Sequence, residues 1–413
     1  MLTAISRYGA RVLPNTEEIV AGCKARGEFI RGPQIAEFER AFAARAGAGH
    51  AISASYGRMA FHYILKALEL PPGSEIVLPA LTFWVVPDLA RVAGLKVVFA
   101  DVDPATFTMD PASLERVITP ATRAVVPTHL YGLPCDMEAI LAVAQRHNLR
   151  VIEDCAHALG ASFDGRPVGT LGDAGFFSFQ TLKPLNCYGG GMALVRDPAV
   201  AARVRELAER EPWPDQKRVE NRLLVGRLQR IFIKPWVFTI SAFPILWVSS
   251  LIGANPDVYL WEEIRSLDPL PDSYTERMPN VQAAIGLAAL QKLDEWTALT
   301  RRHAGMITES LRDVPGISVP VVPPRRTHVY YQYCVHGPKR DELVVRCVRR
   351  GVDIETLHVD VCSDLELFGD ARADMPGARR AAEAMQVPVY STLTDAQAAR
   401  VARVVRKVLT TAT

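Results

Sequence analysis

Short runs of apolar, β-branched residues alternate with longer segments of mixed polarity in the first half of the chain. These runs, which we predict to be strands, lie at 51–53, 75–78, 96–100, 124–128, 150–153, 174–179 and 191–196. The intervening segments are long enough for helices, as at 57–70 and 136–147. Strands this apolar, alternating with helices, are typical of a parallel sheet covered on both faces. We therefore predict an α/β fold with a mostly parallel central sheet flanked by helices.

The pattern changes after the last of these strands. Asp197 followed by Pro198 is typical of a helix start, and residues 210–272 show no regular period. Residues 279–303 then read as one long helix, because apolar side chains recur on roughly one face. The end of the chain is α+β in character and contains a capping box at 394–397. We expect a large domain over 1–272 and a smaller C-terminal α+β domain over 273–413.

An apolar insertion near 228–260 contains a run without any charge, at 235–254. Its length is close to the ~20 residues that cross a bilayer, but the central Pro244 argues against a span. Three basic residues precede it and two tryptophans lie within it: Arg227, Arg230, Lys234, Trp236 and Trp247. This composition suits a helical hairpin that lies in a membrane interface. The competing interpretation is burial at a subunit interface or over the mouth of an active site.

The overall composition excludes several classes of protein. With 413 residues, 49% hydrophobic and 22% charged, the chain is not disordered. Its 47 basic and 45 acidic residues leave a net charge of +2, which gives no reason to expect nucleic acid as a partner. The seven cysteines are scattered, so we expect free thiols and no metal site. The first 20 residues do not resemble a secretory signal, so we expect a cytoplasmic protein, with membrane-surface contact through 235–254 as the alternative.

Two residues that follow apolar strands carry the candidate chemistry. Asp154 ends the run VIED, where a lone acid is most often a helix cap, and Lys183 ends FFSFQTLK, where a lone lysine is most often on the surface. Pyridoxal phosphate needs both types: a lysine to form a Schiff base with its aldehyde and a carboxylate to keep its ring nitrogen protonated. Its phosphate needs hydroxyl groups and the backbone N–H groups of a helix start. Ser178 and the turn at 55–58 can supply these.

Nearly the whole chain resembles the sugar aminotransferases of the DegT/StrS group, within fold type I of the pyridoxal-phosphate enzymes. The matching stretches lie at 32–47 (GPQIAEFERAFAARAG), 70–83, 99–137, 151–161 (VIEDCAHALGA), 168–183, 277–296 and 387–397. The resemblance implies an aminotransferase that uses pyridoxal 5'-phosphate and forms a homodimer with both active sites at the interface. It also implies an amino-acid donor, glutamate by preference, and a keto acceptor, which is a nucleotide-linked keto sugar in the leading interpretation.

The resemblance assigns roles to individual positions. Lys183 holds the cofactor and moves the proton, Asp154 pairs with the pyridine nitrogen, Ser178 binds the phosphate, His157 lies beside the phenolic oxygen, and Phe83 stacks on the ring, with Trp84 as the competing choice. Some relatives carry histidine in place of the lysine and act as dehydratases. The lysine here therefore favours amino transfer.

Three places depart from the family pattern. Tyr56-Gly57-Arg58 stands where the family has Ser-Gly-Thr; Gly57 still lets the backbone approach a phosphate, and Arg58 either contacts that phosphate or faces solvent. Thr275 stands where the family has an asparagine that reaches the phosphate of the neighbouring subunit. No second histidine follows His358, although many sugar-specific members have one.

Two alternatives to a sugar aminotransferase stay open. The first is an aminotransferase that acts on a lipid or lipid-linked carbonyl compound at a membrane surface, which the uncharged run and the missing histidine favour. The second is a regulator that binds the cofactor without turnover. The presence of both Lys183 and Asp154 argues against the regulator, because such a protein needs neither residue.

Overall fold

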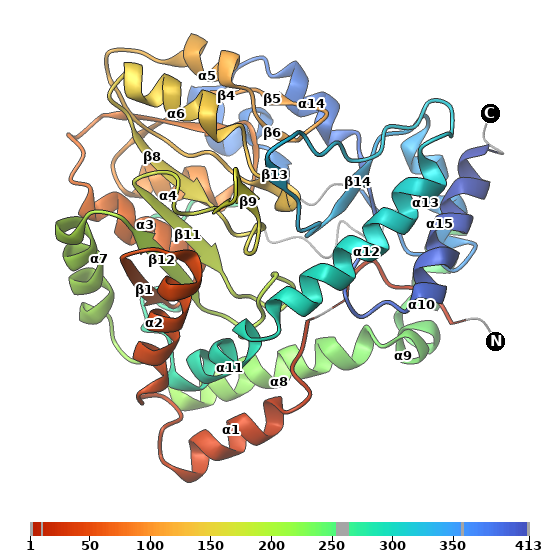
Figure 1. Cartoon of the computed structure of the whole chain (residues 1–413), viewed down its shortest axis with the longest axis horizontal. Helices are drawn as coiled ribbons and strands as arrows, with labels where there is room; N and C mark the ends of the chain where they lie inside the picture. Colours follow the sequence, from red (N-terminus) through yellow and green to blue (C-terminus); the bar gives the residue numbers. More distant parts are fainter. Residues whose placement is uncertain (1–2, 10, 253–263, 357–358, 411–413) are drawn as a thin grey trace.

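A seven-stranded sheet forms the centre of the computed structural model, which describes residues 3–9, 11–252, 264–356 and 359–410 (Figure 1). The strand order is β1-β12-β11-β8-β7-β2-β4. The strands are β1 (His50–Ala54), β2 (Glu75–Pro79), β4 (Lys96–Ala100), β7 (Thr122–Val125), β8 (Arg150–Asp154), β11 (Ala174–Ser178) and β12 (Gly191–Val195). Strand β12 runs antiparallel to β1 and β11, and the other neighbours are parallel. The predicted α/β fold with a mostly parallel sheet is confirmed.

Helices cover both faces of this sheet. One face packs against α3 (Gly57–Ala67), α4 (Val85–Val92) and α7 (Pro198–Arg210), and the other against α2 (Gln34–Ala46), α5 (Pro111–Val117), α6 (Met137–Arg146) and α11 (Asn280–Leu290). Adjacent residues of β11 show why its sequence is continuously apolar: Phe176 contacts Phe61 of α3, while Phe177 contacts Phe42 of α2. Successive strand side chains point to opposite faces, so both Phe176 and Phe177 of this covered strand are buried against helices.

The predicted helix starts are confirmed by their capping bonds. The Asp197 side chain accepts hydrogen bonds from the backbone N–H groups of Ala199 and Val200 at the start of α7. At the start of α15 (Asp395–Thr410), the Thr394 N–H donates to Gln397 Oε1 at 2.8 Å and the Gln397 N–H donates to Thr394 Oγ1 at 3.2 Å. This reciprocal pair is the capping box that the sequence indicated.

The prediction of one long helix over 279–303 is wrong. The structure has two helices there, α11 and α12 (Leu293–Leu311), separated by Gln291 and Lys292. Helix α11 packs on α2 within the core that covers the sheet, whereas the later part of α12 packs on α15 in a separate C-terminal core. The helix breaks because the chain has to change direction between the two cores. The prediction missed the break because an interruption of two residues hardly changes the spacing of the apolar side chains.

Residues 210–272 are largely helical where they are described, contrary to the irregular structure we predicted for this range, although the helical hairpin suggested for 235–254 is present up to residue 252. They contain α8 (Gln216–Phe232), α9 (Pro235–Ile240) and α10 (Ala242–Ile252). The hairpin turns at Ser241, not at Pro244, because Pro244 lies in the first turn of α10, where a missing N–H costs nothing. Among the described residues, no helix combines the length and the apolar character needed to span a membrane. Residues 253 and 254 of the uncharged run, like His358, lie outside the described residues.

The C-terminal core surrounds a three-stranded sheet, β14-β17-β15, made of Tyr333–Val335, Met385–Val387 and Glu355–Thr356. Helices α12, α13 (Arg340–Val348) and α15 pack around it. Ile5 from the start of the chain joins this core, where its N–H donates to the Gly351 carbonyl and its carbonyl accepts from Asp353 N–H, both at 2.9 Å. A domain boundary at 272/273 stays a prediction.

The start of α3 lies so close to the ends of β11 and β12 that two glycines are required. A Cβ atom at Gly57 would lie 2.7 Å from the Phe177 carbonyl oxygen, and one at Gly191 would lie 2.3 Å from the Gly57 nitrogen. Both distances are shorter than a van der Waals contact. The small residues therefore bring the first N–H groups of α3 to the carboxyl edge of the sheet, where the candidate site lies.

Replacing Gly57 tests this close approach. Gly57→Ala should lower the free energy of unfolding by about 1–3 kcal/mol, because the added methyl group meets backbone that has little room to move. The matched control is Gly305→Ala, within α12, where nothing lies within 4 Å of the new Cβ atom. That change should be neutral or stabilise the protein by up to about 1 kcal/mol. Equal effects of the two substitutions in urea unfolding would contradict the packing argument.

Candidate active site

A cavity of about 920 Å³ opens at the carboxyl ends of β8 and β11. Seven of the eight predicted site residues line it: Gly57, Arg58, Phe83, Asp154, His157, Ser178 and Lys183. The eighth, Thr275, does not line the cavity that the described residues form. Its hydroxyl donates to the Asp272 carbonyl at 3.3 Å. Trp84, the competing choice for the ring, is buried in the core beside Phe83.

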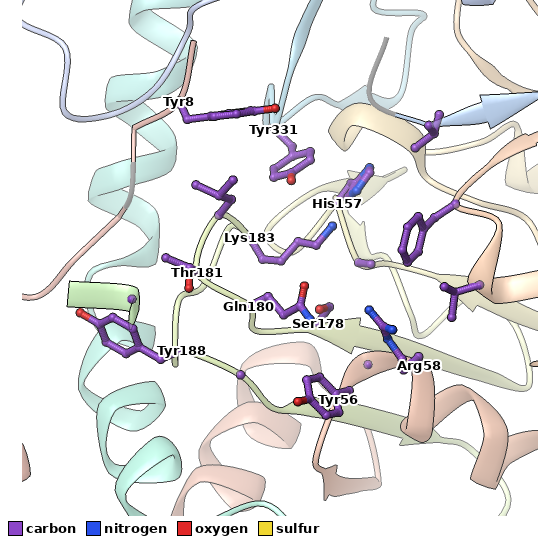
Figure 2. Close-up of a pocket in the computed structure, with 18 of the residues that line it drawn as sticks. Tyr8, Tyr56, Arg58, His157, Ser178, Gln180, Thr181, Lys183, Tyr188 and Tyr331 are labelled. Carbon is purple, nitrogen blue, oxygen red and sulfur yellow. The ribbon is translucent and has the colours of Figure 1, made fainter. Parts of the chain in front are cut away.

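Lys183 lies in the turn after β11 and extends into the cavity toward Tyr331 and His157 (Figure 2). Its Nζ atom is 5.1 Å from the centre of the Tyr331 ring. Burial lowers the pKa of this amine to about 8, and the Arg58 cation contributes in the same direction, while the Asp154 carboxylate opposes both. A larger share of Lys183 is thus neutral, and nucleophilic, near neutral pH than for an exposed lysine.

Asp154 ends β8, the strand that pairs in parallel with β11. Its Oδ1 atom accepts a hydrogen bond from the Ala156 N–H at 3.0 Å. Burial raises the pKa of this carboxyl group to about 6, and the Ala156 N–H and the Lys183 cation limit the rise. The group is therefore mostly ionised above pH 6, and it can keep a proton on a basic nitrogen placed between it and Lys183.

Glu153, the residue before Asp154, points to the other side of β8 and is fully buried. Its oxygens accept hydrogen bonds from the N–H groups of Gly169, Leu171 and Gly172 at 2.7–2.8 Å and contact His129 Nε2 at 2.9 Å. His129 Nδ1 accepts from the Cys135 N–H at 3.0 Å, so its proton is on Nε2 and is donated to Glu153.

This arrangement holds β8 in register beneath the site. The backbone N–H of His129 donates to the Asp154 carbonyl at 3.0 Å, so the buried pair is connected directly to the carboxylate that faces the cavity. Glu153, His129 and Cys155 are also close enough together to suggest a metal site. We read the cluster as structural, because the three backbone N–H groups and the imidazole already occupy the Glu153 oxygens.

The opposite end of the cavity is suited to an anion. Helix α3 begins here with no side-chain cap on its first N–H groups, and Ser178 lies beside Gly57. The Arg58 guanidinium lies over the rings of Tyr274 and Phe83, at 4.7 and 5.6 Å, and donates to the Tyr274 hydroxyl. The backbone N–H groups of a helix start and a nearby cation form the usual site for a phosphate group. Arg58 therefore lies on the cavity wall, and its contact with a phosphate stays a prediction.

Several residues of the wall were not predicted from the sequence. Arg222 of α8 donates to the Tyr56 hydroxyl at 2.8 Å, beside the start of α3. At the other end, Tyr331 stacks on His157 with ring centres 4.2 Å apart, and Tyr8 donates to Glu355. These residues come from segments far apart in the chain, and none is part of a short motif. Only the fold brings them together.

Comparison with known proteins agrees with this geometry. A sequence profile of the DegT/DnrJ/EryC1/StrS aminotransferase family matches residues 14–228 and 258–406. The chain is 31% identical over 400 residues to a pleiotropic regulatory protein of Geobacillus stearothermophilus, covering 95% of this chain and 94% of that one. It is 30% identical over 406 residues to a UDP-N-acetyl-3-dehydro-alpha-D-glucosamine 3-aminotransferase of Acidithiobacillus ferrooxidans, covering 97% and 96%. The crystal structure of the aminotransferase TlmJ from Streptoalloteichus hindustanus superposes with a TM-score of 0.80 at 28% identity, covering 99% of this chain and 100% of that one.

The titration of Lys183 tests the electrostatics of the cavity. Trinitrobenzenesulfonate reacts only with neutral amines, so its rate of reaction with Lys183 should rise with pH and reach half its maximum near pH 8, as followed by peptide mass spectrometry. Arg58→Ala should move the midpoint to higher pH, because a cation that disfavours the charged amine is lost. Asp154→Asn should move it to lower pH, because the favourable anion is lost. The Lys183→Arg protein should give no label on this peptide, which confirms that Lys183 is the residue labelled. A midpoint that moves to lower pH in Arg58→Ala, or to higher pH in Asp154→Asn, would refute the assignment.

Proposed function

This chain belongs to the DegT/DnrJ/EryC1/StrS aminotransferase family, and on that premise we propose that it binds pyridoxal 5'-phosphate at Lys183 and transfers an amino group to a nucleotide-linked keto sugar. The donor in this proposal is an amino acid, glutamate by preference. The observation that carries the proposal is that a basic amine, Lys183, and an acidic carboxyl group, Asp154, line the same cavity. We further propose that the protein acts as a homodimer, in which Thr275 reaches the phosphate of the neighbouring subunit.

The residues of the cavity fit this cofactor. Lys183 would bind its aldehyde, and Asp154, which is ionised above pH 6, would hold its ring nitrogen protonated. The uncapped start of α3, together with Ser178 and Arg58, would hold the phosphate. A Cβ atom at position 57 would lie 2.7 Å from the Phe177 carbonyl oxygen, so glycine is the residue that lets the start of α3 lie this close to β11. When bound, pyridoxal phosphate supplies a conjugated ring that accepts electrons from the substrate carbon.

Lys183 has a second task in this proposal. The amine of the donor would replace the Lys183 amine at the aldehyde carbon, which frees Nζ. Nζ would then remove the proton from the donor Cα and deliver it to that aldehyde carbon. The depressed pKa of the amine suits both steps, since a base with a pKa near the working pH both accepts and returns a proton readily. Phe83 and His157 would limit the movement of the ring, and Tyr331 would help to exclude water.

Two observations bear on the acceptor. The relative from Acidithiobacillus ferrooxidans is named for a UDP-linked keto sugar, which supports a nucleotide-linked sugar as the leading acceptor. Val225, Phe232 and Ile233 of the α8 region also line the cavity and give part of its wall an apolar character. These side chains favour, as a second candidate, a lipid or lipid-linked carbonyl compound.

A regulator without turnover is the third interpretation, and one relative is named a pleiotropic regulatory protein. A regulator would not need a lysine with a lowered pKa opposite a buried carboxylate. The family assignment also makes this chain an enzyme. We therefore propose turnover, and the following substitutions test it.

Lys183→Ala should lower the rate of amino transfer from glutamate by about 10³-fold, because both the attachment point and the proton carrier are lost. Asp154→Asn should retain cofactor binding and lower the rate roughly 10–100-fold, because an amide cannot stabilise the ring cation as a charge-assisted bond does. Single-turnover kinetics would measure both effects. Lys292→Ala, an exposed lysine on α11's C-terminal side, serves as the control. A Lys183→Ala enzyme of near wild-type rate would exclude the proposed role.

The acceptor is tested by running the second half-reaction alone. The protein is first converted by glutamate to the amine form of the cofactor and then mixed with panels of nucleotide-linked keto sugars and lipid-linked ketones. The absorbance of the aldehyde form should return with a nucleotide-linked keto sugar. Return with lipid ketones alone would favour the second candidate, and return with neither would refute both acceptors.

A further inference from the structure

We propose that the α9–α10 segment, residues 235–252, is a docking surface for an anionic lipid bilayer. This inference concerns binding and does not depend on the proposed reaction. The segment lies between the two ranges that match the family profile, 14–228 and 258–406, so the properties common to the family do not account for it. In Figure 1 its two helices lie at the periphery, away from the central sheet.

The outer side of the segment consists of large apolar side chains in contact with solvent. Trp236, Ile240 and Ile245 are 62%, 70% and 66% exposed, the highest values among the large apolar residues that the structure describes. Trp247, Val248 and Leu251 are 40–52% exposed. An apolar patch of this kind on an isolated chain usually marks a surface that is covered by a partner or a membrane.

The inner side of the segment is firmly attached to the protein. Val237 and Phe238 of α9 are buried, and Phe238 contacts Phe243 of α10 with ring centres 5.9 Å apart. The Thr239 hydroxyl accepts a hydrogen bond from the Ala4 N–H at 2.7 Å, and α10 packs on α13. The exposed residues are thus presented by a docked helix pair and not by a loose loop.

The charges around the segment complement an anionic surface. From residue 221 to residue 252 the chain has four basic residues and no acidic one. Arg222 and Arg230 line the cavity and Arg227 pairs with Glu17, so the basic residue of this stretch that lies next to the apolar side chains of α9 is Lys234. Lys234 is exposed at the start of α9, and at the other end the Arg349 guanidinium donates to the Ser250 carbonyl at 2.8 Å. Cations therefore flank the apolar side at both ends, and the two tryptophans have the amphipathic rings that prefer the interface between lipid and water.

The same charges favour a bilayer over a second copy of the chain. In a two-fold dimer through this surface, each patch would meet its own copy, and Lys234 and Arg349 would face a partner with the same positive charge. An anionic bilayer supplies the opposite charge for these cations and an apolar layer for the tryptophan and isoleucine side chains. Phe232 at the end of α8 and Ile233 after it line the cavity and lie within three residues of this segment, so the active site would open close to the lipid surface.

Flotation of the full-length protein with vesicles tests the proposal. Wild-type protein should float with vesicles of phosphatidylcholine and phosphatidylglycerol at low salt, and less with phosphatidylcholine alone. High salt should weaken binding without abolishing it, because the apolar contribution is not screened. The triple variant W236S/I240S/I245S should lower the partition coefficient at least tenfold. The reactivity of Lys183 toward trinitrobenzenesulfonate should stay unchanged in this variant, since none of the three residues lines the cavity.

The matched control is I264S/V321S/V322S, which removes three exposed apolar side chains elsewhere on the surface. It should bind vesicles like the wild type. The proposal is overturned if wild-type protein does not float with anionic vesicles at low salt, or if the control variant loses binding to the same extent. It is also overturned if W236S/I240S/I245S dissociates an oligomer on a sizing column, because the surface is then an interface between copies of the chain.

Discussion

The burial of an amine and a carboxylate in the same cavity is the constraint on which the site depends. Burial alone drives both groups toward their neutral forms, and it lowers the pKa of Lys183 to about 8 and raises that of Asp154 to about 6. Their mutual attraction limits both shifts, because each charge favours the charged form of the other. The two residues can meet only because β8 and β11 are parallel neighbours that end at the same edge of the sheet.

The surrounding residues hold this edge in place. Glu153 and His129 form a saturated buried network behind Asp154, and the contact of Gly57 with β11 fixes the start of α3. Each of these features is buried and closely packed, so small displacements are costly. The rest of the cavity wall, by contrast, is built from the first residues of the chain, the C-terminal core and α8, and these parts contain none of the short motifs that the sequence offered.

The sequence predicted the sheet well because each strand is buried on both faces and is therefore apolar throughout. It also predicted Lys183 and Asp154, since both follow such strands, and the resemblance to a family added Phe83, His157 and Ser178 to the cavity wall. It failed at 279–303 and 210–272, because a two-residue break and an irregular apolar period leave no clear local signal. It missed Tyr331, Glu355 and Arg222, which reach the cavity through tertiary structure alone.

The central claim is that Lys183, held opposite Asp154, is the residue to which pyridoxal phosphate binds. Borohydride reduction of the protein incubated with the cofactor fixes the bond permanently, and mass spectrometry of the digested protein then identifies the modified lysine. The account predicts one phosphopyridoxyl group for each chain, on the peptide that contains Lys183, and no stable label on this position in the Lys183→Ala protein. A label at another lysine, or none after reduction of a folded protein saturated with cofactor, would contradict it.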